Sequence, residues 1–141
     1  MTAISIGSAR YSSSWMAISV FLLVAVGSGC AEAPAAATIS QKNLAARISD
    51  ASAPVIFDVR SEKEFASGHV PGAVNLPYDE IADRLAGQNL DPDDEIVVYC
   101  ESGRRAAVAE EALRHAGFTS VRHLEGDMRG WRESHLPCDG C

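Results

Sequence analysis

Two apolar runs, each followed by a helix signal, constrain the fold of this chain most strongly. The runs are VIFDVR at residues 55–60 and EIVVYC at residues 95–100, and both are rich in β-branched side chains. Short apolar runs of this kind are typical of strands buried on both faces. The second run leads into the alanine-rich segment RRAAVAEEALRHAG, which ends at Gly117 as helices commonly do. Strands that alternate with helices favour βαβ units and a parallel sheet.

Weaker signals predict the remaining elements of an α/β domain. Ser40 can cap a helix over residues 41–49, and Ser61 with Glu64 forms a capping box for a short helix that ends at Gly68. Turn residues and apolar spacing predict four further elements: short strands at 74–76 and 121–124, a helix at 79–87 and a last helical turn at 127–133.

The first 29 residues differ in composition from the rest of the chain. They contain no Asp or Glu, and they include the apolar run WMAISVFLLVAV at residues 15–26. A run of about 12 residues is too short to cross a bilayer as a helix, but it has the length of a signal-peptide core. We therefore expect residues 1–29 to be a signal peptide and the protein to be exported to the periplasm or cell envelope.

The segment GSGC, which ends at Cys30, resembles the lipobox of bacterial lipoproteins. In that family the cysteine is lipidated and becomes the new N-terminus, although Gly27 stands where a leucine is usual. Cleavage after Ala33 or Ala37, or retention of an uncleaved anchor, is the alternative. Residues 30–37 would form a small-residue tether.

The charge balance of the chain limits its partners. Lys and Arg number 12 against 19 Asp and Glu, which gives a formal net charge of −7. An acidic chain without basic runs is a poor fit to nucleic acid or to anionic membrane surfaces. We expect a monomer that contacts membrane only through its N-terminal lipid anchor.

Cys100 lies between the second apolar run and the clearest helix. In open parallel sheets, sites lie beyond the carboxyl ends of strands, where helices begin. The residues after Cys100, ESGRR, provide a glycine and successive N–H groups that can bind an anion and favour thiolate over thiol. Arg104 and Arg105 add positive charge, which Glu101 opposes. The alternative is an inert, buried cysteine at a strand end.

Three separated motifs resemble the rhodanese domain. CESGRRA resembles its active-site loop, C-x-x-G-x-R, with Cys100, Gly103 and Arg105 in register. VIFDVRSEKEFASGHVPGAVNLP is similar to the upstream signature of the family, and GFTSVRHLEGDMRGW resembles its closing segment. In that segment the family has a pair of glycines, and this chain has Gly126-Asp127. The sequence alone indicates no catalytic role for this difference. The resemblance covers residues 38–137 and implies a five-stranded parallel sheet with helices on both faces.

The resemblance also implies an activity. Cys100 would accept sulfane sulfur from a donor such as thiosulfate, hold it as a persulfide and pass it to cyanide or a thiol, without a metal or organic cofactor. Arg105 would fix the loop and attract an anionic donor. The implied substrate-binding residues are Glu101, Ser102, Gly103 and Arg104. Because Glu101 adjoins the nucleophile, it would cost a dianionic donor on the order of 1 kcal/mol.

Two other functions deserve comparison with sulfur transfer. Phosphatases and arsenate reductases related to rhodaneses use a longer C-x5-R loop, whereas this loop closes as C-x4-R at Arg105, which disfavours them. A rhodanese-fold binding module or a thiol redox sensor in the cell envelope is the alternative from another class.

The remaining polar residues of the upstream signature favour structural roles. Asp58 and Arg60 are expected to form an ion pair that fixes neighbouring loops, because buried charges are normally paired. His69 is expected to pack within its loop, and Glu64 to act in the capping box.

The tail HLPCDGC carries Cys138 and Cys141, which do not belong to the family pattern. In an exported protein a C-x-x-C pair most simply forms a local disulfide. The pair could instead resolve or receive the persulfide of Cys100. A metal site with His135 would have only three ligands at a chain end, so none is predicted.

Overall fold

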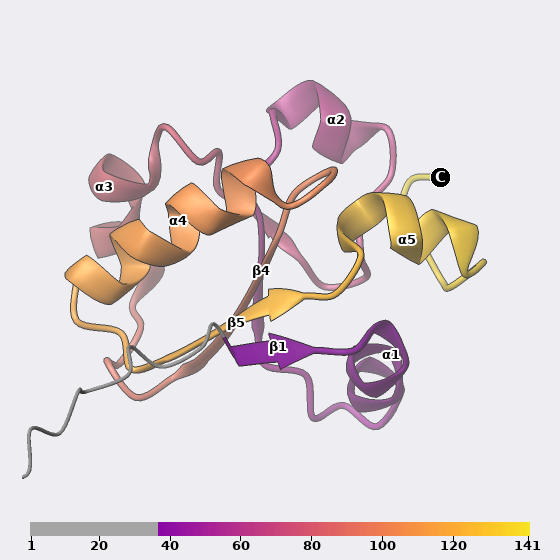
Figure 1. Cartoon of the computed structure of the whole chain (residues 1–141), viewed down its shortest axis with the longest axis horizontal. Coiled ribbons are helices and arrows are strands. Elements are labelled where there is room, and N and C mark those ends of the chain that lie inside the picture. The colour runs from indigo at the N-terminus through magenta and orange to yellow at the C-terminus, as the bar shows by residue number, and fades with distance from the viewer. Residues whose placement is uncertain (1–36) are drawn as a thin grey trace, which may run out of the picture. The chain divides into compact units, whose positions relative to one another are not determined.

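The computed structural model describes residues 37–141 (Figure 1). The predicted signal peptide, the candidate lipidation site at Cys30 and residues 30–36 of the predicted tether lie outside this range. The elements, in chain order, are β1 Ala37–Ile39, α1 Gln41–Ser49, β2 Val55–Asp58, α2 Glu62–Ala66, β3 Val74–Asn75, α3 Ile81–Arg84, the 3-10 helix η1 Leu85–Gln88, β4 Glu95–Tyr99, α4 Arg104–His115, β5 Ser120–Leu124 and α5 Asp127–Glu133. Within the described range, no helix has the length and apolarity needed to cross a membrane.

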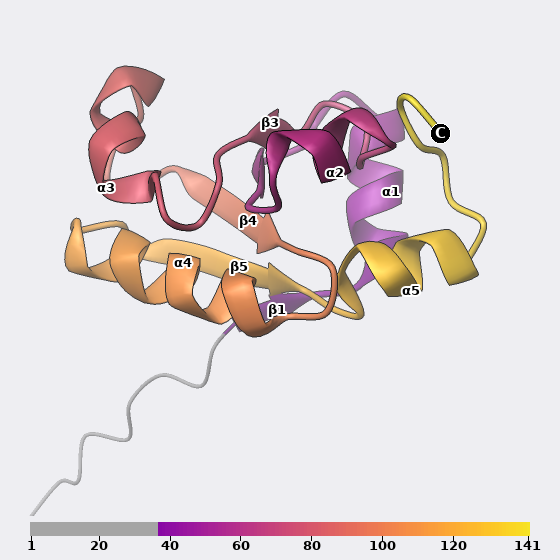
Figure 2. The ribbon, with the colours of Figure 1, turned by 90° about the horizontal axis from the view of Figure 1, so that it is seen from above.

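The five strands form one sheet in the order β1-β5-β4-β2-β3, and every neighbouring pair is parallel. Helices lie on both faces of the sheet, as the two perpendicular views show (Figures 1 and 2). The predicted fold, a five-stranded parallel sheet between helical layers, is confirmed.

The core consists of two apolar clusters, one on each face of the sheet. Ile96 and Val98 of β4 pack toward the cluster that contains residues of α3 and α4. Val97 and Tyr99 pack toward the other cluster, with residues of α1 and α5. Because alternate residues of β4 enter different clusters, the strand must be apolar on both faces, which explains its unbroken apolar sequence.

The two predicted helix caps are present. The side chain of Ser40 accepts a hydrogen bond from the Asn43 N–H at 3.3 Å, and Ser61 and Glu64 form the reciprocal capping box of α2. Each cap satisfies backbone N–H groups that the first turn of a helix leaves without partners.

Two elements differ from the expectation. Strand β1 begins at Ala37, the last residue of the predicted tether, and it pairs with β5 at the sheet edge, with Ile39 opposite Leu124. A strand this short carries no alternation that sequence could reveal. The helix expected at 79–87 is a single turn of α-helix followed by η1, which ends at Asn89 with a φ of 54°. Short 3-10 segments commonly tighten helix ends in this way.

Candidate active site

Cys100 follows β4 directly and is buried, with 1% of its surface exposed. The loop after it turns through Gly103, the N-cap of α4, whose φ is 94°. This left-handed conformation suits a residue without a Cβ. The turn brings the Gly103 N–H to 3.1 Å from the Cys100 sulfur, to which it donates a hydrogen bond. A backbone donor at the start of a helix therefore faces the sulfur, an arrangement that favours negative charge there.

The start of α5 holds the other side of the loop. The carbonyl of Cys100 accepts from the Met128 N–H at 3.0 Å, and that of Glu101 accepts from the Arg129 N–H at 3.3 Å. The Cys100 N–H donates to Asp127 Oδ1 at 2.9 Å. Asp127, the residue at which the sequence departs from the glycine pair, therefore contacts the backbone of the candidate nucleophile. The only sequence signal for this contact was the departure itself.

Arg105 forms a two-pronged ion pair with Glu64. Its Nη1 and Nη2 atoms each lie 2.7 Å from a carboxylate oxygen of Glu64. Hydrogen bonds from Arg105 hold the pKa of Glu64 at about 2, despite the opposing effect of burial, and the same bonds raise the pKa of Arg105. Glu64 thus has a second role beside the predicted capping box. The pair ties the first turn of α4 to α2.

Replacing Glu64 with glutamine is expected to destabilise the domain by about 1 kcal/mol at neutral pH, because it weakens a bidentate pair. The pKa of Glu64 falls from 4.5 to about 2 on folding, so its contribution is present above pH 4.5 and is lost as the pH falls toward 2. Urea unfolding between pH 2 and 7 should therefore show a shallower acid loss of stability in the variant.

The matched control for that experiment is Glu80→Gln. Glu80 pairs with Arg84 at 2.9 Å on an exposed helical turn, so its replacement should change stability at neutral pH by no more than about 0.5 kcal/mol. Equal losses in the two variants at neutral pH would contradict a special role for the Glu64–Arg105 pair.

Arg60 and Asp58 form the predicted ion pair. Arg60 Nη2 lies 2.6 Å from Asp58 Oδ2, and the two side chains are 1% and 0% exposed. The same nitrogen donates to the Gly68 carbonyl at 2.8 Å, and Nη1 lies 3.6 Å from a carboxylate oxygen of Glu101. The buried pair thereby connects β2, the loop at Gly68 and the candidate active-site loop.

Glu101 has two arginine neighbours. Besides Arg60, it accepts a hydrogen bond from Arg132 of α5. The negative charge that the sequence sets beside the nucleophile is therefore balanced within the fold. The penalty expected for an anionic donor is correspondingly smaller than adjacency in sequence suggests.

Ser102 and Arg104 occupy the exposed part of the loop. Neither side chain has a hydrogen-bond or ion-pair partner among residues 37–141. Arg104 is therefore the arginine of the loop whose charge is not already committed to a carboxylate of the described chain.

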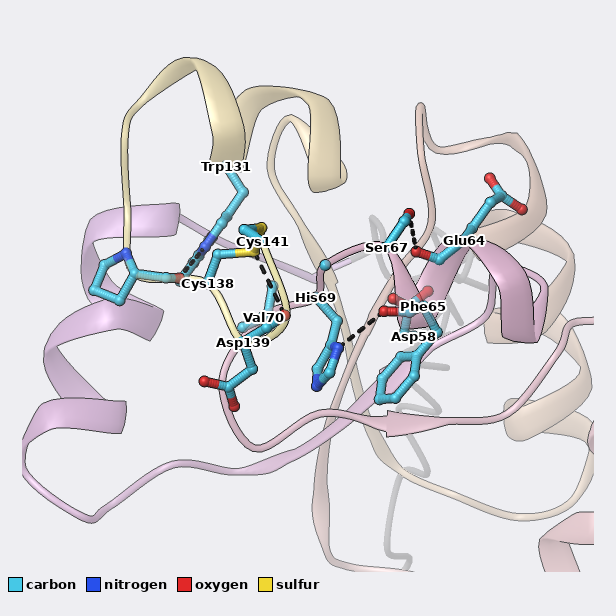
Figure 3. The surroundings of a disulfide bond; sticks show 12 residues. Asp58, Glu64, Phe65, Ser67, His69, Val70, Trp131, Cys138, Asp139 and Cys141 are labelled. Atoms are coloured by element: carbon cyan, nitrogen blue, oxygen red, sulfur yellow. Dashed lines mark hydrogen bonds between the residues drawn. A yellow bond between two sulfur atoms is a disulfide. The ribbon is translucent and has the colours of Figure 1, made fainter.

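His69 packs within its loop, as predicted. Its ring stacks on Phe65 with centroids 3.7 Å apart, and Nδ1 lies 3.0 Å from the Phe65 carbonyl (Figure 3). Its backbone forms a pair of hydrogen bonds, each 3.0 Å, with Asp139 in the tail. His69 therefore also anchors the C-terminal segment.

Cys138 and Cys141 form a disulfide in the structure (Figure 3). The bond packs against Gly68, where a side chain would collide with the Cys141 sulfur. The indole of Trp131 donates to the Pro137 carbonyl at 2.7 Å and fixes the start of the tail. The two tail sulfurs are bonded to each other. Within residues 37–141, no group of three or more His, Cys, Asp or Glu side chains is arranged to hold a metal ion.

Comparison with known proteins places these features in a family. The family model described as Rhodanese-like domain matches residues 40–134. A transcriptional regulator of the HTH type from Mycobacterium tuberculosis is 42% identical over 86 residues, which cover 60% of this chain and 37% of the regulator. Thiosulfate sulfurtransferase 16 of Arabidopsis thaliana is 37% identical over 93 residues, which cover 57% of this chain and 76% of the plant protein.

A crystal structure of a protein from Anabaena superposes with a TM-score of 0.65 at 30% identity, over 73% of this chain and 82% of that one. The chain spans well under half the length of the mycobacterial regulator that it matches. The family match covers more than half of the chain, including the whole Cys100 loop, and the chain therefore belongs to the rhodanese family.

Proposed function

We propose that this protein is a sulfurtransferase that carries sulfur on Cys100 as a persulfide. The observation that carries the proposal is the hydrogen bond of 3.1 Å from the Gly103 N–H to the Cys100 sulfur, at the start of α4. Backbone donors fixed in this position stabilise a thiolate or the terminal sulfur of a persulfide without having to reorganise. The similarity to a plant thiosulfate sulfurtransferase supports the same activity.

The reaction balances as two displacements, with thiosulfate as the donor. The Cys100 thiolate attacks the outer sulfur of thiosulfate, a new S–S bond forms, and the bond to the sulfonate sulfur breaks with its electron pair leaving on sulfite. Cyanide or a thiolate then attacks the outer sulfur of the persulfide. That S–S bond breaks and its electron pair returns to Cys100, so no external oxidant or reductant is needed.

Local charge favours a small anionic donor despite the acidic balance of the chain. Arg104 is exposed beside the loop, and the carboxylate of Glu101 is paired with Arg132 and lies near Arg60. Arg104 can therefore attract an anionic donor locally, since solvent and salt screen the distant surface carboxylates.

The test is to incubate the purified protein with thiosulfate and to map its cysteine peptides by mass spectrometry. We expect the peptide that contains Cys100 to gain the mass of one sulfur atom, and to lose it on addition of cyanide as thiocyanate appears. If no cysteine gains sulfur and no thiocyanate forms, the proposal is wrong.

A second candidate is a rhodanese-fold sensing or binding module. The relative that is a transcriptional regulator favours it, since such a domain can serve within a regulatory protein. A strain that carries Cys100→Ser separates the two. Retention of the cellular role would favour the module, and its loss together with sulfur transfer would favour the enzyme.

The proposal includes export to the cell envelope with a lipid on Cys30. The disulfide between Cys138 and Cys141 supports an oxidising compartment, where such bonds persist. Mass analysis of the mature N-terminus from the membrane fraction tests it: lipid on Cys30 is expected, and an unprocessed Met1 would contradict it.

A further inference from the structure

Three ionisable side chains with little exposure lie beneath the Cys100 loop and take no part in the transfer steps above. They are Glu110 of α4, His123 of β5 and Asp127 of α5, whose side chains are 3%, 19% and 6% exposed. His123 Nδ1 lies 2.5 Å from Glu110 Oε1, and His123 Nε2 lies 3.1 Å from Asp127 Oδ2. The other oxygen of Asp127 accepts from the Cys100 N–H. A continuous set of hydrogen bonds therefore ends on the backbone of the candidate nucleophile.

The network touches the loop at a second point. A Cβ built on Gly103 would lie 3.2 Å from Asp127 Oδ2 and 3.5 Å from His123 Cε1. Gly103 is the residue whose N–H donates to the Cys100 sulfur. Asp127 therefore lies against both the residue that donates this hydrogen bond and the residue that accepts it, and a shift of Asp127 would change their separation.

Asp127 occupies a backbone conformation that glycine would adopt more easily. Its φ is 53°, in the left-handed region that most side chains avoid, although Asp and Asn tolerate it better than others. The carboxylate compensates through its two hydrogen bonds. Aspartate in place of glycine thus adds a contact to Cys100 that a glycine pair could not make.

In this network a histidine lies between two carboxylates, an arrangement that favours the protonated imidazole. The hydrogen bonds that His123 donates to Asp127 and then to Glu110 raise the pKa of His123 to about 10, against the effect of burial. At neutral pH both ring nitrogens therefore carry protons and donate to the two carboxylates. Glu110 also lies 3.5 Å from Arg114, so the cluster contains two cations and two anions.

On the basis of the proposed function, we propose that Asp127, held in place by His123 and Glu110, is a positioning residue that sets the distance between the Cys100 sulfur and the Gly103 N–H. A role in stability alone would not require that an oxygen of Asp127 accept a hydrogen bond from the Cys100 N–H. Buried ionic groups often add little net stability compared with apolar residues of similar volume, so the value of this network lies in the geometry it imposes.

The test compares Asp127→Gly with Asp127→Asn in the full-length protein. The glycine variant removes the acceptor for the Cys100 N–H but permits the same backbone angle. We expect its kcat to fall about tenfold or more, with KM for thiosulfate within about twofold, because Asp127 touches the nucleophile and not the substrate. The asparagine variant keeps an oxygen for the Cys100 N–H but replaces the oxygen that accepts from His123 with an NH2 group, so its kcat should lie between those of the wild type and Asp127→Gly.

Asn89→Gly is the matched control, because Asn89 also has a positive φ, of 54°, and its side chain makes no hydrogen bond to the loop among the described residues. Its kcat should equal that of the wild type. Equal losses in Asn89→Gly and Asp127→Gly would overturn the proposal, since both would then report a general loosening of the fold.

Two readouts do not depend on sulfur transfer. Amide hydrogen exchange at Cys100 and the rate at which iodoacetamide modifies the peptide that contains Cys100 should both change in Asp127→Gly, and should change less in Asp127→Asn, which keeps the acceptor for the Cys100 N–H. If the wild type takes up no sulfur, the proposed function fails while these measurements still decide the role of Asp127. Unchanged exchange and alkylation in Asp127→Gly would overturn that role.

His123→Gln keeps the test decisive if Asp127→Gly does not fold. This variant leaves Asp127 in place but removes the cation that holds it. We expect a loss of kcat of several fold and faster exchange of the Cys100 amide. A folded His123→Gln with wild-type kcat and wild-type exchange would show that the network does not position the nucleophile.

Discussion

Replacing Cys100 with serine is expected to reduce thiocyanate formation from thiosulfate and cyanide by roughly a thousandfold or more. A hydroxyl stays protonated at neutral pH and cannot hold the transferred sulfur as a persulfide. Serine is close in size to cysteine, so the fold should persist at this position, which is 1% exposed. Initial rates, compared at equal folded fraction by circular dichroism, measure the effect.

The control for that variant replaces the other pair of cysteines in the described chain. Cys138→Ser combined with Cys141→Ser removes the disulfide that packs against Gly68 but leaves Cys100 unchanged. It should lower the melting temperature while keeping the rate within about threefold. A loss of rate as large as in Cys100→Ser would instead indicate that the tail pair receives or resolves the persulfide.

Replacing Asp58 with alanine is expected to reduce the free energy of unfolding by about 3–5 kcal/mol. Arg60, which is 1% exposed, would then be buried without the carboxylate that lies 2.6 Å from it. Removal of one partner of a buried pair costs more than the pair contributes, because the remaining charge stays out of water. Urea unfolding at neutral pH measures the loss.

An exposed ion pair provides the comparison for Asp58→Ala. Glu80→Ala removes a carboxylate that is 49% exposed. This carboxylate pairs with Arg84, four residues further along the chain, which is the usual spacing of ion pairs on a helix. Its expected loss is no more than about 0.5 kcal/mol. A loss below about 1 kcal/mol for Asp58→Ala would mean that water reaches Arg60. Its interaction with Glu101 would then be screened by solvent and weak.

The central strands and the capped helices could be predicted from sequence because their signals are local. The unbroken apolar sequence of β4 reflects burial on both faces, and Ser61 with Glu64 satisfies backbone donors within one turn. Strand β1 could not be predicted, because three residues at an edge carry no pattern. The 3-10 turn that follows α3 could not be predicted for a different reason, because the helix tightens just before Asn89, whose left-handed backbone ends it.

The position of Cys100 at a strand end and ahead of a helix follows from residues next to it in the chain. The partners of the loop do not. Arg105 and Glu64 are 41 residues apart, Glu101 and Arg132 are 31 apart, and the Cys100 N–H and Asp127 are 27 apart. Local sequence sets backbone preference and apolar pattern, and these sufficed for the central strands and for the loop around Cys100, whereas the five-stranded sheet was implied by the resemblance to the rhodanese family. Which charges meet depends on the parallel order of the strands, which brings α2, α4 and α5 to the same edge, and that order exists only in the folded chain.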